Sequence, residues 1–225
     1  MPAYRVDRNE ALRYLGYAGQ ATDGLLDERI DELIAACERL SKPGFVYRIF
    51  PVEQTPAGVR LAGSSLVLEG EAIAEHLRGA RACAVMACTL GLANEAAAQR
   101  MKAKSALDAL VFGAAGSSLV ECVADACEAA VVADAARRGL HTNWRFSPGY
   151  GDLPLAIQPA IVRALAADKK LGMTATDSNL LIPVKSVTAF VGLFDELRER
   201  TKRSCAGCAC FAHCSLRKAG TPCYR

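Results

Sequence analysis

Five of the ten cysteines lie in the last 21 residues of this 225-residue chain, from 205 to 225. Thiolates at such short spacing can close on one soft metal centre, because a Cys-x2-Cys step brings two sulfurs into one turn. Two later cysteines then complete a four-sulfur shell. The predicted ligands are Cys205, Cys208, Cys214 and Cys223, with Cys210 left spare.

The spacing leaves the identity of the metal open. Both an iron–sulfur cluster and a structural zinc ion accept four thiolates. His213 is an alternative zinc ligand in place of one cysteine, although the adjacent Cys214 makes that geometry awkward. The remaining alternative is a tail with free thiols or disulfides. A metal is favoured over disulfides because the rest of the chain has the character of an intracellular protein.

The composition is that of a globular protein, with 52% hydrophobic and 23% charged residues. A chain of this length can bury a sizeable core. The net charge of +3 is too small to indicate a nucleic-acid partner. The first seven residues lack the apolar core of a signal peptide, and we identify no apolar stretch of the about 18 residues that a membrane span needs. We therefore predict a cytoplasmic protein with no membrane partner.

Hydrophobic periodicity predicts an α+β fold, a twisted antiparallel sheet packed against helices. Helices are expected over 8–16, 25–40, 71–77, 94–104, 106–138 and 158–167. Strands are expected over 45–52, 59–61, 65–68, 81–89, 173–176 and 186–193. We expect the last two strands to pair with each other, and Gly113 and Gly116 are candidate interruptions of the longest helix. The predicted domains are 1–200 and a metal-binding tail, 201–225.

The segment 144–154 is dense in turn formers and carries Arg145, Tyr150 and Asp152. Polar and aromatic side chains on such a loop are better candidates for function than core residues. Residues 144–154, Trp-Arg-Phe-Ser-Pro-Gly-Tyr-Gly-Asp-Leu-Pro, resemble a loop in the activation domain of cobalamin-dependent methionine synthase. The resemblance continues through 170–178 and through the Pro-x-x-Ser-Val segment at 183–187.

The resemblance implies a domain that binds S-adenosylmethionine and presents its methyl group to cobalamin. A low-potential electron donor supplies the electron that this reaction needs. The chain is expected to be a free-standing version of the domain. Its partner would then be a separate cobalamin-dependent methionine synthase, or a related corrinoid methyltransferase, which supplies the cobalamin.

The same resemblance implies a set of ligand-binding residues. Arg145 is expected to hold the ligand carboxylate through a bidentate fork, and Glu121 to accept from its ammonium. Tyr150 is expected to stack on adenine or to lie near the sulfonium, and backbone groups from Ser147 to Gly149 to meet adenine edges. The chain departs from the family at Ser118, where an arginine is usual, and at 151–154, where the family has Pro-Ala-Cys-Pro.

Two functions remain open at this point. In the first, the chain reductively activates the corrinoid enzyme, and an iron–sulfur cluster in the tail relays the electron, since such clusters span roughly −700 to +450 mV. In the alternative, the chain is a non-redox docking module for a corrinoid protein, and zinc stabilises its tail. An independent methyltransferase is less favoured, because the chain has no glycine-rich strand-to-helix turn of the nucleotide-binding type.

Overall fold

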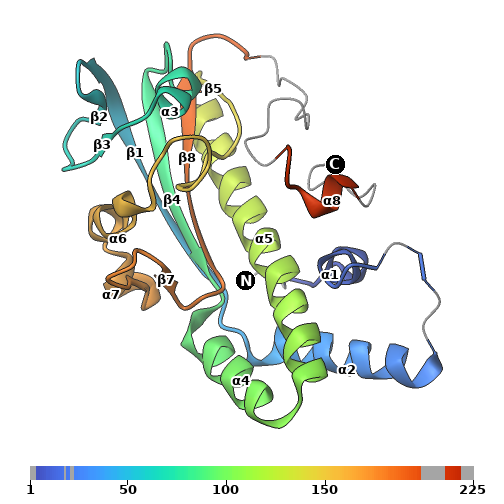
Figure 1. The fold of residues 1–225 in the computed structure, drawn as a ribbon. Helices are drawn as coiled ribbons and strands as arrows, with labels where there is room; N and C mark the ends of the chain where they lie inside the picture. The colour runs from blue at the N-terminus through green and yellow to red at the C-terminus, as the bar shows by residue number, and fades with distance from the viewer. Residues whose placement is uncertain (1–3, 18, 21–22, 199–210, 219–225) are drawn as a thin grey trace.

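The structure is a computed structural model that describes residues 4–17, 19–20, 23–198 and 211–218. Its centre is an open six-stranded antiparallel sheet with the strand order β3-β2-β1-β4-β8-β5 (Figure 1). The strands are β1 (Gly44–Thr55), β2 (Gly58–Leu61), β3 (Val67–Leu68), β4 (Ala82–Thr89), β5 (His141–Thr142) and β8 (Ser186–Phe194). The predicted fold class, an antiparallel sheet packed against helices, is confirmed.

The central strand β4 is buried on both faces, as its continuous apolar run predicts. Side chains alternate across a strand, so residues five apart point to opposite faces. Cys83 accordingly lies in the core on one side of the sheet and Cys88 in the core on the other. The sheet therefore separates two hydrophobic cores, and each needs its own cover of helices.

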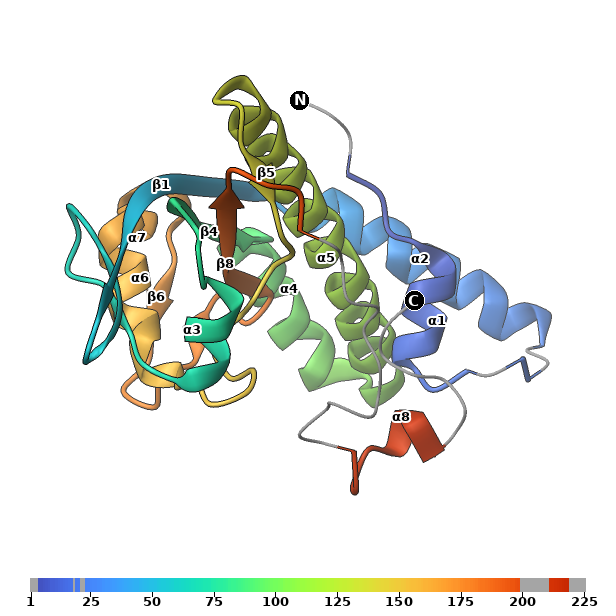
Figure 2. The ribbon, with the colours of Figure 1, turned by 90° about the horizontal axis from the view of Figure 1, so that it is seen from above.

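One face is covered by α5 (Ala106–Arg137), a helix of 32 residues (Figures 1 and 2). It runs through Gly113 and Gly116 without interruption, and the Ser105 side chain caps its start by accepting from Asp108 N–H. Three helices pack against α5 or its neighbours: α1 (Arg8–Tyr14), α2 (Gly24–Leu40) and α4 (Gly91–Lys104).

By length and composition α5 could cross a membrane, so the expectation that no stretch reaches this length is wrong. Half of its most apolar window is buried inside the protein. Phe112, Leu119 and Val123 of α5 pack on the sheet in the same core as Met86 and Val191. The apolar character of α5 is therefore accounted for by its position as the central core helix.

The opposite face is covered by α3 (Glu71–His76), the short turn η1 (Leu155–Ile157), α6 (Gln158–Leu165) and α7 (Ala167–Leu171). The apolar face of α6, with Ile161, Val162 and Leu165, packs on Val85 and Phe190 of the sheet. A left-handed residue, Ala166 with φ +51°, separates α6 from α7. The single helix predicted over 158–167 is thus broken near its expected end.

The predicted pairing of 173–176 with 186–193 is wrong. Strands β6 (Thr174–Ala175) and β7 (Leu181–Ile182) pair with each other in a separate hairpin. The turn closes locally, because Thr176 N–H donates to Leu180 O at 2.9 Å and Asn179 adopts the left-handed φ of +62°. The long strand β8 instead pairs with β4 along its whole length.

Candidate functional site

The outer edge of β8 is open along its first half. β5 pairs only with Leu193 and Phe194, and a single bridge joins Phe146 to Phe190. Phe190 exchanges both backbone hydrogen bonds with Phe146, each at 2.9 Å. Alternate residues turn their backbone groups to the same side, so Thr188 and Ser186 face this edge as well. Within the described part of the chain no strand pairs there, which leaves main-chain donors and acceptors beside the loop 144–154.

Three hydrogen bonds fold this loop into tight turns. Tyr150 N–H donates to Ser147 O at 3.1 Å, Leu153 N–H to Tyr150 O at 3.1 Å, and Gly149 N–H to Leu153 O at 2.8 Å. Gly149 has a φ of +90°, a conformation that glycine adopts without strain. The turns leave the Tyr150 side chain 60% exposed, with its ring 6.2 Å from the Phe146 ring in an edge arrangement.

Asp152 fixes the far end of the loop to α3. Its carboxylate accepts from Glu71 N–H at 2.5 Å and from Ala72 N–H at 3.0 Å, so it caps a helix 80 residues away in sequence. These backbone hydrogen bonds hold the pKa of the Asp152 carboxyl below its usual value. The sequence singled out Asp152 only as a polar loop residue, because a cap supplied from so far along the chain leaves no local pattern.

Replacing Gly151 by alanine is expected to loosen this loop. Gly151 has a φ of +56°, and an added Cβ would lie 2.6 Å from the Ala72 Cβ. We expect a loss of about 1–3 kcal/mol in the free energy of unfolding from backbone strain alone, with a further loss from the clash. Gly63→Ala is the matched control, because Gly63 has a φ of +79° and open space around it. Equal losses in thermal unfolding of the two variants would show that the contact with α3 does not matter.

Arg145, one residue before Phe146, extends to three carboxylates on α5. Its Nη2 lies 2.7 Å from Asp125 and 3.3 Å from Glu121, and its Nε lies 3.3 Å from Glu128. The side chain is only 16% exposed. Burial acts to lower the pKa of the guanidinium, but Asp125, Glu121 and Glu128 outweigh it and raise the pKa above the ordinary value. Nη1 is buried and has no hydrogen-bond partner among the described residues.

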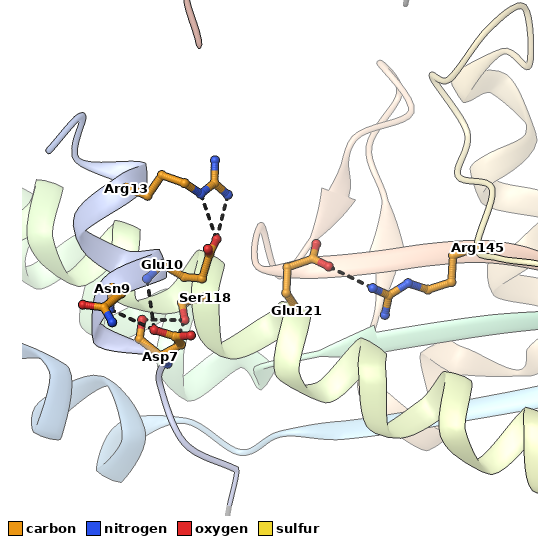
Figure 3. A network of polar contacts seen from close by, with 7 residues as sticks. All are labelled: Asp7, Asn9, Glu10, Arg13, Ser118, Glu121 and Arg145. Carbon is orange, nitrogen blue, oxygen red and sulfur yellow. Dashed lines mark hydrogen bonds and ion pairs between the residues drawn. The ribbon is translucent and has the colours of Figure 1, made fainter. Parts of the chain in front are cut away.

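Figure 3 shows Arg145 and Glu121 pointing toward each other, with the start of the chain on the other side of Glu121. Ser118, where the resemblance led us to expect an arginine, instead anchors this start: its hydroxyl accepts from Asp7 N–H at 3.0 Å and donates to Asp7 O at 3.1 Å. Asp7 then caps α1, and Glu10 pairs with Arg13 on the next turn. The partly exposed face of α5 around Glu121 therefore lies between α1 and the Arg145 loop.

His76 contacts the first residues of the loop 144–154. Its Nε2 lies 3.0 Å from Trp144 O, and its ring contacts those of Trp144 and Phe146 at centroid distances of 5.3 and 5.0 Å. Asn143 links the same region to the sheet, because it donates to His76 O at 2.8 Å and accepts from Gly192 N–H at 2.8 Å. Burial lowers the pKa of His76 to about 4, so the imidazole is neutral at physiological pH.

The structure thus brings together Arg145 and Glu121, and places Ser147, Gly149 and Tyr150 in one turn. Within the described part of the chain, Tyr150 contacts Phe146 rather than Arg145 or Glu121. The sequence did not predict any of the three carboxylates Glu121, Asp125 and Glu128 as a partner of Arg145, since Glu121 was expected to accept from the ligand ammonium. Their spacing of four and three residues was the available signal, since it aligns the three carboxylates on one side of α5.

The cysteine tail is described only in part. Cys205, Cys208, Cys210 and Cys223 lie outside the described residues. Cys214 precedes α8 (Ser215–Lys218), and its Sγ accepts from Arg217 N–H at 3.4 Å. His213 is exposed. Among the residues that the structure describes, no group of three His, Cys, Asp or Glu side chains could hold a metal ion. The metal site therefore stays a prediction.

No family model and no curated protein sequence matches the chain. Among solved structures, the chain is similar to the MetH reactivation domain, crystallised bound to AdoHcy. The two share 17% sequence identity with a TM-score of 0.63, over 84% of this chain and 74% of that one. The chain therefore has the fold of the MetH reactivation domain.

Proposed function

We propose that the chain binds S-adenosylmethionine on the surface between the β8 edge and the Glu121 face of α5, and that it activates a cobalamin-dependent methionine synthase or a related corrinoid methyltransferase. The observation that carries the proposal is the Arg145–Glu121 pair beside an open strand edge. It occurs in a fold shared with a reactivation domain that binds AdoHcy.

The residues of this surface fit the ligand's chemistry. One guanidinium and three carboxylates leave the Arg145 cluster with an excess of negative charge, which suits the two cationic groups of S-adenosylmethionine, its ammonium and its sulfonium. Glu121 accepts from the ammonium, and the buried Nη1 of Arg145 is open to donate to a ligand oxygen. The exposed Tyr150 ring offers a stacking surface to adenine, and the turn from Ser147 to Gly149 offers backbone groups to its edges.

In this role the chain holds the methyl donor and does not accept the methyl group itself. The methyl group passes from the sulfonium to the corrinoid of the partner, and AdoHcy remains bound to the chain. The transfer needs a corrinoid that has first taken up one electron from a low-potential donor. The partner supplies the corrinoid, so activity is expected only with both proteins present.

The tail is proposed to relay that electron through an iron–sulfur cluster held by Cys205, Cys208, Cys214 and Cys223. The hydrogen bond from Arg217 N–H to Cys214 Sγ supports a thiolate ligand at this position, because hydrogen bonds to ligating sulfurs stabilise their negative charge and tune the potential. The alternative is that zinc stabilises the tail and the chain is a non-redox docking module for a corrinoid protein.

Calorimetric titration of the protein with AdoHcy tests the binding proposal. Binding to the folded state should also raise the melting temperature with ligand concentration. The proposal fails if AdoHcy at millimolar concentration produces neither heat of binding nor a shift in melting. The corrinoid partner is tested separately, by whether added chain, with S-adenosylmethionine and a low-potential reductant, restores the activity of a methionine synthase inactivated by oxidation of its corrinoid.

For the tail we predict that protein purified without oxygen absorbs broadly at about 400 nm and contains about four irons per chain, as a four-cysteine cluster does. The double variant Cys205→Ser/Cys208→Ser should lose the iron while the melting of the body is unchanged. Cys122→Ser, on α5, is the control and should keep it. One zinc and no colour would remove the redox role and favour the docking module.

A further inference from the structure

Lys185, just before β8, is a half-buried cation that forms no salt bridge within the described residues, although the nearby charge of Glu95 favours its ammonium. Its Nζ donates to Ser117 Oγ at 2.7 Å, and its stem lies against Gly116, where an added Cβ would be 3.3 Å away. Burial lowers the pKa of the ammonium. No carboxylate among the described residues forms an ion pair with it. The nearby Glu95 instead accepts from Val184 N–H at 2.9 Å.

Hydrogen bonds of its own carbonyl and of the next residue fix the backbone at Lys185. Its carbonyl accepts from Leu90 N–H at 3.0 Å. The next residue, Ser186, donates to Pro183 O at 2.6 Å and to Thr89 Oγ1 at 2.8 Å. A lysine held in this way is pre-organised for a ligand, because little backbone freedom remains to be lost on binding.

Lys185 also stands at one end of the open β8 edge, and on the same face of α5 as Glu121. Ser117 and Glu121 are four residues apart, so they lie one above the other with a rise of about 6 Å. Along this face the charge changes sign, from the Lys185 ammonium beside Ser117 to the carboxylates that begin at Glu121. The guanidinium of Arg145 is already shared among three acids and only its Nη1 has no hydrogen-bond partner among the described residues, so Lys185 is a second cation for an anionic group.

We propose that Lys185 is a further ligand-binding residue of this surface, and that it holds the α-carboxylate of the adenosyl amino acid while Glu121 accepts from the α-ammonium. An amino acid carries its two opposite charges on neighbouring groups, which matches a cation and an acid one helical turn apart. The inference rests on the proposed function. It adds a carboxylate contact that the resemblance had placed at Arg145.

Two ligands distinguish a contact with the carboxylate from a general effect on ligand binding: AdoHcy and its decarboxylated analogue, which keeps the ammonium, thioether and adenosine. Lys185→Met is expected to weaken AdoHcy by about tenfold to a hundredfold, as for a lost hydrogen bond between charged groups. The analogue should bind wild type and Lys185→Met equally. Lys185→Arg should recover part of the AdoHcy affinity. Lys169→Met, exposed on α7, is the control and should change neither.

If Lys185→Met loses the same affinity for both ligands, or loses none for either, the assignment of Lys185 is wrong. Binding of AdoHcy by the wild type would in that case still support the proposed function. If wild type binds neither ligand, the proposed function fails and the role of Lys185 fails with it. Circular dichroism and melting of Lys185→Met establish that the variant is folded. If it is not, Lys185→Gln takes its place in the same comparison.

Discussion

Replacing Arg145 by glutamine is expected to destabilise the protein and to weaken AdoHcy binding together. The variant removes the guanidinium that Glu121, Asp125 and Glu128 of α5 share. Glutamine also cannot supply the buried donors that the guanidinium provides. We expect the free energy of unfolding to fall by about 2 kcal/mol, which corresponds to a decrease of about 4–8 °C in melting temperature for a domain of this size.

Binding should fall by about tenfold or more, since Glu121 loses the partner that orients it and the ligand loses a charged donor. Arg145→Lys is the informative second variant, because it keeps the charge and loses the planar fork. It should recover most of the stability and little of the affinity. Arg163→Met, at an exposed position on α6, controls for the loss of a positive charge. An Arg145→Gln protein with wild-type melting would show that the three acids are individually solvated.

Much of the fold could be predicted because local patterns in the sequence determine its main helices and strands. The apolar run of β4, the helical spacing in α2 and the alanine-rich α5 each bury a face that the residue order itself defines. The error at β6 has the opposite origin. The short strands β6 and β7 pair with each other through a turn at Asn179. The strand β8 pairs with β4 instead, where both of its faces are buried. Propensity alone does not decide between such partners.

The candidate site was predicted in part, for a similar reason. Arg145 and Tyr150 stand in a recognisable loop, so the sequence indicated them directly. Lys185 and Asp152 gain their roles from contacts 68 and 80 residues or more away, with Ser117 and with the start of α3. Such contacts leave no periodicity or spacing in the sequence, and only the packed structure brings them into view.

Acid should destabilise the protein through His76, and this is the largest effect of pH that we expect. Burial against Trp144 and Phe146 lowers the pKa of His76 from 6.5 to about 4 in the folded state. Between these values the unfolded chain binds a proton that the folded chain does not, so the free energy of unfolding falls as the pH falls. A shift of this size corresponds to about 3 kcal/mol, lost progressively from pH 6.5 down to about 4 and constant below that.

The His76→Gln variant isolates this effect, because glutamine does not titrate. Urea unfolding of wild type and variant should give curves that diverge at neutral pH, where the wild type is more stable, and that converge as the pH approaches 4. His141→Gln, at an exposed position on β5, should follow the wild type. The bond from His76 to Trp144 O holds the segment that carries Arg145, so AdoHcy affinity should decline over the same pH range. Parallel curves for wild type and His76→Gln would place the acid sensitivity elsewhere in the protein.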